Sequence, residues 1–330
     1  MSQHAAEGFR PVEFPSEGVI LRGRLYLPST YGARDARGRY PLLVMAHGFT
    51  STMPMTTDRY AEAFAARGLA VLLYDHRNTG LSGGEPRREV NPWIQARGYR
   101  DAVRFARESL VEADPDRIAL WGLSNSGMQV LVLGALLEGQ IAAVTAVVPS
   151  CGDQPPPPDP DGRLFSLLRD TFERGDVSGT PETIAGPMPV VSFAPLHYPS
   201  HLDPPTAFRW FMEHGGRPGS GWINDATRVV PSTPAPFSPS IAAPHVRIPT
   251  QVIYAPDDEM GRANPAITRL VCSGLRGPKD VVELEKGCGH FGELWYPSPW
   301  FDRVSAVQTA FLLRHLLPDA EARSCLDGSI

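Results

Sequence analysis

Most of the chain alternates between short apolar runs and longer stretches in which apolar residues recur every three or four positions. Continuous apolar runs predict strands that are covered on both faces, and the longer periodic stretches predict amphipathic helices. The strands expected on this basis are 40–46, 69–74, 117–121, 141–148, 250–255 and 280–284. The helices expected between and after them are 57–67, 92–110, 128–137, 264–272 and 300–317.

The first strands follow a different pattern. Residues 9–14 and 19–27 alternate apolar with polar side chains around a turn at 15–18, which predicts a hairpin at the antiparallel edge of a sheet. The later alternation of strand and helix predicts a parallel sheet with helices on both faces. In such sheets ligands bind beyond the carboxyl ends of the strands, so residues that directly follow a strand are candidates for chemistry.

The alternation stops between residues 153 and 246, a block that opens with QPPPPDP. Its aromatic and apolar content argues for order, and helices are expected at 162–174 and 205–215. We interpret the block as a helical cap, or lid, over the sheet, with most of its aromatic residues packing within the cap. The expected organisation is an α/β core from 1–152 and 247–330 with a cap insertion at 153–246, and a frayed tail after Pro318.

Composition narrows the functional classes. The 330-residue chain is 42% hydrophobic with a net charge of −5, which leaves no basic surface for nucleic acid or for an anionic membrane. Neither a signal peptide nor a membrane-spanning stretch is apparent, so we expect a cytoplasmic protein. The scattered cysteines lack metal-type spacing, and free thiols with no metal and no cofactor are expected at Cys151, Cys272, Cys288 and Cys325.

A candidate nucleophile lies between the strand 117–121 and the following helix. The sequence Gly122-Leu-Ser-Asn-Ser-Gly127 is a turn of small residues, and a serine at such a strand-to-helix turn is held with its hydroxyl exposed above the sheet. Ser124 is therefore the predicted nucleophile. The pattern departs from G-x-S-x-G because Ser126 replaces the last glycine, and Ser126 or Ser150 would be the rival nucleophile if the turn were misplaced.

A serine needs a base to remove its proton and an acid to orient that base. The order serine, acid, histidine is the order found in folds with this turn. His290 lies in a glycine-flanked loop after strand 280–284 and is the predicted base. Asp258, just after strand 250–255, is the preferred acid from its offset to the strand end. The alternatives are Asp257, Glu259 and, after another strand, Asp153.

Acyl transfer also requires donors for the developing oxyanion. The backbone N–H groups of Asn125, which follows the nucleophile, and of Phe49, in the loop after strand 40–46, are expected to supply them. Gly48 leaves the backbone free to present the second of these donors.

The chain resembles the α/β-hydrolases over most of its length, and the resemblance rests on AHGFTS, YDHRNTGLSGGEPR, WGLSNSG, APDDEM and GCGHFGELW. It is most similar to the microbial branch near dienelactone hydrolases, X-prolyl peptidase-like esterases and fungal polyketide transferases. This resemblance implies a mostly parallel, eight-stranded sheet with a lid. It also implies a triad of Ser124, Asp258 and His290 with an oxyanion hole at Phe49 and Asn125. Dienelactone hydrolases proper use cysteine where this chain has serine.

Three functions fit these residues. The first is a cofactor-independent serine hydrolase for an ester, thioester or lactone of a medium-sized, largely apolar acyl compound, free or carrier-bound. The second is an acyltransferase or cyclase of secondary metabolism that uses the same triad, and the third is a non-catalytic binding protein on the same fold. No nucleic-acid or membrane partner is expected, and the protein would be a monomer or homodimer.

Overall fold

The computed structural model describes residues 8–28 and 34–317. Its centre is an eight-stranded sheet in the order β1-β2-β4-β3-β6-β7-β10-β11. The first two strands join the sheet antiparallel, and all the others pair in parallel. The strands are β1 (Arg10–Ser16), β2 (Val19–Tyr26), β3 (Tyr40–Ala46), β4 (Ala70–Tyr74), β6 (Ala113–Leu123), β7 (Ala143–Val147), β10 (Thr250–Tyr254) and β11 (Lys279–Glu283).

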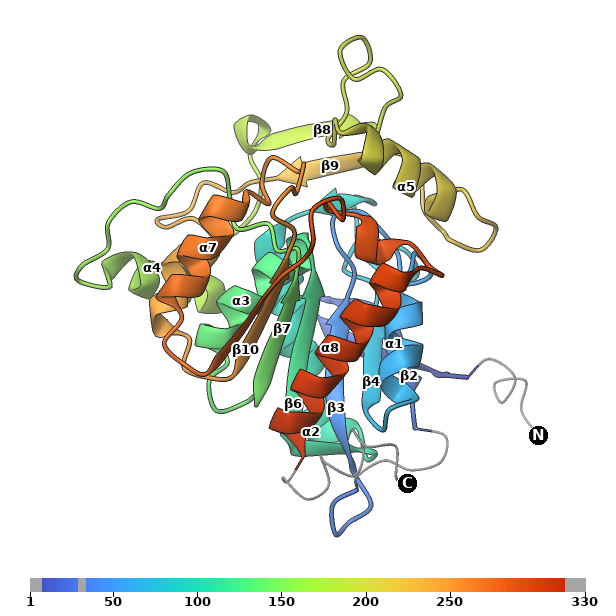
Figure 1. Cartoon of the computed structure of the whole chain (residues 1–330). Coiled ribbons are helices and arrows are strands. Elements are labelled where there is room, and N and C mark those ends of the chain that lie inside the picture. The colour runs from blue at the N-terminus through green and yellow to red at the C-terminus, as the bar shows by residue number, and fades with distance from the viewer. Residues whose placement is uncertain (1–7, 29–33, 318–330) are drawn as a thin grey trace.

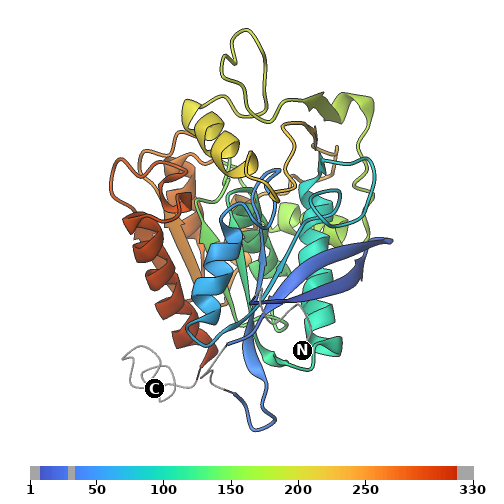
Figure 2. The same cartoon turned by 90° about the vertical axis from the view of Figure 1, so that its right-hand side faces the viewer.

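Helices cover both faces of this sheet (Figures 1 and 2). Successive strand side chains point to opposite faces, so Leu42 and Val44 of β3 join one buried cluster while Leu43 and Met45 join the other. The first cluster includes side chains of α2 (Pro92–Ser109), α3 (Asn125–Leu136) and α7 (Pro265–Gly274), and the second includes side chains of α1 (Thr57–Ala65) and α8 (Pro299–Leu316). Continuous apolar strands are therefore required here, as the sequence pattern indicated.

The predicted eight-stranded, mostly parallel fold is confirmed, and the starts of two elements around Ser124 differ from the expected ones by three and four residues. The helix after the candidate nucleophile starts at Asn125 instead of Met128, because Ser124 alone makes the turn from strand to helix. The strand before it begins at Ala113, four residues earlier than expected, with an irregular register against β3. Two aspartates and a proline at 114–116 interrupt the apolar run, so the apolar pattern does not indicate this extension.

The block at 153–246 is not purely helical. Its helices are α4 (Arg163–Arg174), α5 (Pro205–Gly215) and the short α6 (Pro239–Ala242), with 3-10 turns at Pro181–Thr183 and Ala243–His245. It also forms a three-stranded sheet from β8 (Ile184–Met188), β9 (Ala226–Val229) and β5 (Glu89–Val90). The last strand comes from the loop after β4, outside the block. Strands this short show no readable period, which explains why the helical prediction was incomplete.

The cap packs directly on the core, as Figure 1 shows for α5 and the small sheet above the strand ends. Trp210 of α5 lies with its ring centroid 5.5 Å from that of Phe291, and its indole N–H donates to the Leu294 carbonyl at 3.2 Å. Leu294 belongs to a 3-10 turn at Gly292–Leu294. Trp210 of the cap therefore packs against the core, while Phe193 and Tyr198 of the cap are exposed.

No helix among the described residues combines the length and apolar character needed to cross a bilayer.

Candidate active site

Ser124 sits in a strained turn between β6 and α3. Its backbone has φ 54° and ψ −110°, a conformation that non-glycine residues rarely adopt and that is typical of functional sites. The turn requires glycine at 122, because a Cβ there would lie 2.2 Å from the Ser126 carbonyl oxygen. A Cβ at Gly127 would lie 3.1 Å from Pro149, so helix and sheet approach closely on this side as well. The small residues of the motif thus allow the turn to form.

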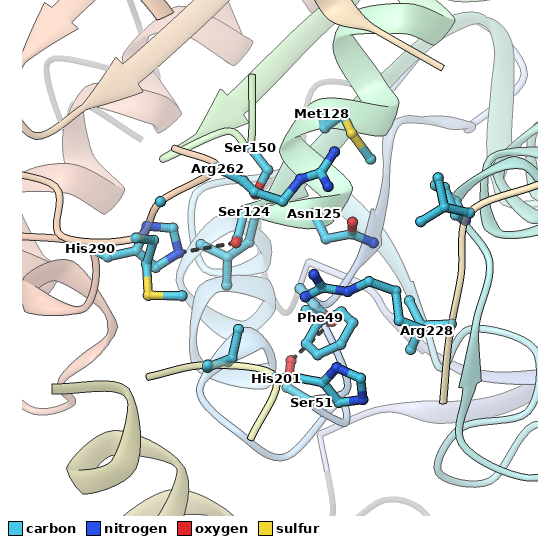
Figure 3. A pocket seen from close by; sticks show the side chains of 18 of the residues that line it. Phe49, Ser51, Ser124, Asn125, Met128, Ser150, His201, Arg228, Arg262 and His290 are labelled. Carbon is cyan, nitrogen blue, oxygen red and sulfur yellow. Dashed lines mark hydrogen bonds between the residues drawn. The ribbon is translucent and has the colours of Figure 1, made fainter. Parts of the chain in front are cut away.

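The structure brings Ser124, His290 and Asp258 together from three separate strand ends. The Ser124 Oγ lies 3.0 Å from His290 Nε2 (Figure 3). His290 Nδ1 lies 2.7 Å from Asp258 Oδ2. The His290 and Asp258 side chains are only 3% and 2% exposed. With Nδ1–H donating to the carboxylate, Nε2 is free to accept the serine proton, which is the tautomer a general base needs.

Two opposing effects act on the pKa of His290. Burial favours the neutral ring, but the adjacent Asp258 carboxylate favours the imidazolium, and the net result is a pKa raised above 6.5. The ring is therefore a better proton acceptor than a free imidazole.

The rejected acids hold the histidine loop. Asp257 accepts hydrogen bonds from the backbone N–H groups of Gly287 and Gly289 at 2.6 and 3.4 Å. Glu259 accepts from the His290 backbone N–H at 2.8 Å. The third alternative, Asp153, is exposed. Of the candidates, Asp258 is the one whose carboxylate bonds the imidazole.

The residues expected to donate to the oxyanion lie close to Ser124. Asn125 is the first residue of α3, and the first N–H groups of a helix have no partner within the helix. The loop that carries Phe49 passes close by, because a Cβ on Gly48 would be 3.3 Å from the Ser124 Cβ. This proximity suits an N–H pair that meets a developing oxyanion, and the assignment of the two donors stays a prediction.

A buried network that sequence reasoning missed involves Ser126. Its hydroxyl donates to the His47 carbonyl at 2.5 Å and accepts from His76 Nε2 at 2.8 Å. Burial, with a contribution from His47, lowers the pKa of His76 well below 6.5, so this ring is neutral. Ser126 thus joins the helix after the nucleophile to the loops after β3 and β4. The serine in place of the usual glycine was the one signal of it in the sequence.

Glu293 was also missed. It is fully buried near His290 and Asp258, and burial raises the pKa of its carboxyl to about 8. The Cys288 thiol donates to Glu293 Oε2 at 3.5 Å. The carboxyl is therefore mainly uncharged at neutral pH, which avoids an isolated buried charge beside His290.

Ser124 opens into a cavity of about 800 Å³ between the core and the cap. A volume of this size holds a medium-sized organic molecule. Much of the lining is apolar or aromatic and comes from Trp93, Met128, Leu202, Phe211, Val229 and Phe237. Two arginines, Arg228 and Arg262, also line it (Figure 3). Among the described residues, no group of three or more His, Cys, Asp or Glu side chains is arranged to hold a metal ion.

Part of the chain is similar in sequence to known proteins. The model of the X-Pro dipeptidyl-peptidase (S15) family matches residues 17–153. The chain is 40% identical over 142 residues to the thiohydrolase aneE of Aspergillus aculeatus, covering 43% of this chain and 42% of that protein. It is 41% identical over 140 residues to the polyketide transferase af380 of Aspergillus fumigatus, covering 42% and 44%. The matched segments thus span less than half the length of these curated relatives.

Over nearly the whole chain the similarity is one of fold. The crystal structure of the α/β-hydrolase GrgF from Penicillium sp. sh18 superposes with a TM-score of 0.66, covering 93% of this chain and 99% of that one at 23% identity. The protein therefore has the α/β-hydrolase fold. Within that fold, residues 17–153 are similar to the S15 family, and segments of 142 and 140 residues are similar to a fungal thiohydrolase and a fungal polyketide transferase.

Proposed function

We propose that the protein is a cofactor-independent serine hydrolase that cleaves an ester, thioester or lactone through an acyl-enzyme on Ser124. The single observation that carries this proposal is the hydrogen-bonded chain from Ser124 to His290 to Asp258, whose first two residues line a cavity of about 800 Å³. The names of the relatives, thiohydrolase and polyketide transferase, support acyl chemistry and favour a thioester among the three bond types.

The proposed steps follow from the geometry. His290 Nε2 takes the Ser124 proton as Oγ attacks the acyl carbon, and Asp258 stabilises the imidazolium that forms. The Phe49 and Asn125 N–H groups bind the oxyanion of the tetrahedral intermediate. His290 then protonates the departing thiol or alcohol, and the acyl group remains on Oγ. A water molecule that gives its proton to His290 attacks the acyl-enzyme, and collapse releases the acid and restores Ser124.

Replacement of the nucleophile tests this function. Ser124→Ala is expected to lower kcat for a chromogenic acyl thioester by about 10⁴-fold or more, because no other group in the triad can form the acyl-enzyme. A fluorophosphonate probe should label the natural chain and not the variant. Ser166→Ala, which alters an exposed serine of α4, is the matched control and should keep natural activity. Full turnover by Ser124→Ala would exclude the proposed mechanism.

A second candidate is transfer of the same acyl group to an alcohol, an amine or an internal hydroxyl, which would make the protein an acyltransferase or cyclase. The observation in its favour is that cap residues such as Leu202, Phe211 and Val229 line the cavity beside Ser124, so that a substrate bound against them would displace water from the acyl-enzyme. Product analysis with and without an added nucleophile separates the two. Purely hydrolytic products under all conditions would eliminate transfer.

We further propose a small-molecule acyl substrate, free or carrier-bound, with the cap at 153–246 selecting it. A cytoplasmic location and a monomeric or homodimeric state belong to the same proposal. The buried free thiols of Cys151, Cys272 and Cys288 support a reducing compartment.

A further inference from the structure

Arg228 is an unusual residue for a largely apolar cavity. It lies on cap strand β9, is half-buried and lines the same cavity as Ser124. Its guanidinium stacks over the ring of Phe49 at 4.6 Å. Within the described parts of the chain, no carboxylate lies within 4.0 Å of this guanidinium and no hydrogen bond leaves it. Burial, with a contribution from Arg262, lowers the pKa of Arg228 to about 10, so the group is still charged at neutral pH.

Two other arginines that are buried or partly buried, Arg88 and Arg97, do have such partners. Arg88, on the same small sheet's border, pairs with Asp225 at 2.9 Å. Arg97 donates to three carbonyl oxygens at 2.7 to 2.9 Å. A desolvated guanidinium without such partners is costly, and the cost is offset when a ligand supplies the missing acceptors.

The carboxylates of the cavity do not serve this purpose. Glu259 accepts from the His290 backbone N–H and from the Thr206 hydroxyl, and Asp203 is exposed. Neither pairs with Arg228. A second cation adds to the positive charge instead, because Arg262 lines the same cavity. Figure 3 shows Arg228 and Arg262 entering from opposite sides, with Asn125 between them.

The position of Arg228 is set by the backbone. Residues Val90 and Arg228 are register partners in the parallel pairing of β5 with β9. The adjacent Val229 is fully buried, which anchors the strand. The guanidinium is thus held against Phe49, whose N–H is one of the proposed oxyanion donors. A group bound by Arg228 would therefore lie beside the Phe49 ring, in the cavity that Ser124 also lines.

We propose that Arg228, assisted by Arg262, binds an anionic oxygen group of the substrate while the acyl carbonyl occupies the site at Ser124. This inference rests on the proposed acyl-transfer function and refines the largely apolar substrate expected from the sequence. Two sources carry such a group, namely a carboxylate on the acyl chain and a phosphate on a pantetheine-type thiol. Guanidinium binds either one through paired, charge-assisted hydrogen bonds.

Four thioesters distinguish the sources. Pentanoyl and glutaryl groups differ by a terminal carboxylate, and each is presented on N-acetylcysteamine, which lacks phosphate, and on 4′-phosphopantetheine. The natural protein should favour at least one anionic substrate over pentanoyl-N-acetylcysteamine in kcat/KM. Arg228→Gln should reduce that preference by about 10- to 100-fold, the range expected for a lost charged hydrogen bond. Arg228→Lys should retain part of it, and Arg217→Gln, which alters an exposed cap arginine, should retain it all.

The pattern of loss identifies the group. A preference for glutaryl on both thiols that disappears in Arg228→Gln assigns the carboxylate, and a preference for phosphopantetheine with both acyl groups assigns the phosphate. Equal losses on all four substrates, or no anionic preference in the natural protein, would overturn the inference.

Binding separates this inference from the proposed catalysis. Calorimetry on Ser124→Ala with the same four thioesters needs no turnover. A binding preference that depends on Arg228 would support the anion site even if the natural protein cleaved none of them, in which case the hydrolase proposal alone would fail. Turnover of the neutral thioester through Ser124 without any anionic preference would support the hydrolase proposal and exclude the anion site.

Discussion

At the residue scale, three consecutive acids after β10 have different partners. Asp257 bonds backbone N–H groups of the histidine loop, Asp258 bonds the imidazole, and Glu259 bonds the His290 backbone. Asp258 therefore orients the base, while its neighbours Asp257 and Glu259 hold the loop that carries the base.

This division leads to a prediction for the pH dependence of the reaction. In the natural protein kcat/KM should fall as the pH drops through the raised pKa of His290, above 6.5, because the protonated ring cannot accept the Ser124 proton. Asp258→Asn removes the charge that raises this pKa, so the midpoint should move to lower pH. The same variant should lower kcat by roughly 10³- to 10⁴-fold through loss of the productive tautomer. The measurement is a pH profile of kcat/KM with a chromogenic ester.

Asp257→Asn is the matched control. It should leave the midpoint close to that of the natural protein, since Asp257 does not contact the ring. If it lowered kcat as much as Asp258→Asn, the acid would be wrongly assigned.

The sequence predicted the three distant side chains because each lies in the turn or loop after a parallel strand, and those strand ends meet at one edge of the sheet. The bonds of Ser126 to His47 and His76 were not predictable in this way. They depend on how the start of α3 packs against the loops after β3 and β4, and no period or spacing in the chain encodes that packing.

At the scale of elements, Arg97 links the core to the cap. From α2 its guanidinium donates to the carbonyls of Phe172, Thr171 and Gly175 at the end of α4, and it lies 3.2 Å from the Glu17 carboxylate. The last carbonyls of a helix lack partners within the helix and carry partial negative charge. The Arg97 guanidinium therefore supplies both the missing hydrogen-bond donors and a favourable positive charge.

Arg97→Met is therefore expected to lower the free energy of unfolding by roughly 2–3 kcal/mol, because it leaves several acceptors without a charged donor. Arg104→Met, on the same helix, removes a side chain that is 54% exposed and bonded to Asp101. Such exposed pairs contribute up to about 1 kcal/mol. Urea unfolding of both variants gives the comparison, and equal destabilisation would contradict the proposed link.

Helices and strands of the core were predictable to within a few residues because their apolar residues keep one period over five or more positions. The cap sheet was not, since Glu89–Val90 and Ala226–Val229 are too short to show a period. Their pairing also joins segments far apart in the chain, so the local sequence of neither strand indicates a partner.

At the scale of the whole molecule, cap and core share a hydrophobic cluster. Val190, Trp210 and Phe211 of the cap belong to the same buried cluster as Phe291 and the inner side chains of α8. Unfolding the cap alone would expose core surface, so the two parts should lose structure together.

We therefore expect one cooperative transition in urea, with coincident midpoints by far-UV circular dichroism and tryptophan fluorescence. Phe211→Leu, in the shared cluster, should lower both midpoints by the same amount, and its cost should be about 1 kcal/mol or more. An early transition seen by fluorescence alone would indicate a cap that unfolds independently.

The pairing of β5 with β9 affects how caps could be exchanged between relatives. A chimera joined at residues 152/153 and 246/247 would take β9 from the donor protein. Its neighbouring strand, at the position of Glu89–Val90, would still come from the recipient protein. The incoming strand that carries Arg228 would then align against an unrelated backbone. A graft that transfers substrate preference should therefore include residues 85–91 of the donor together with the inserted block.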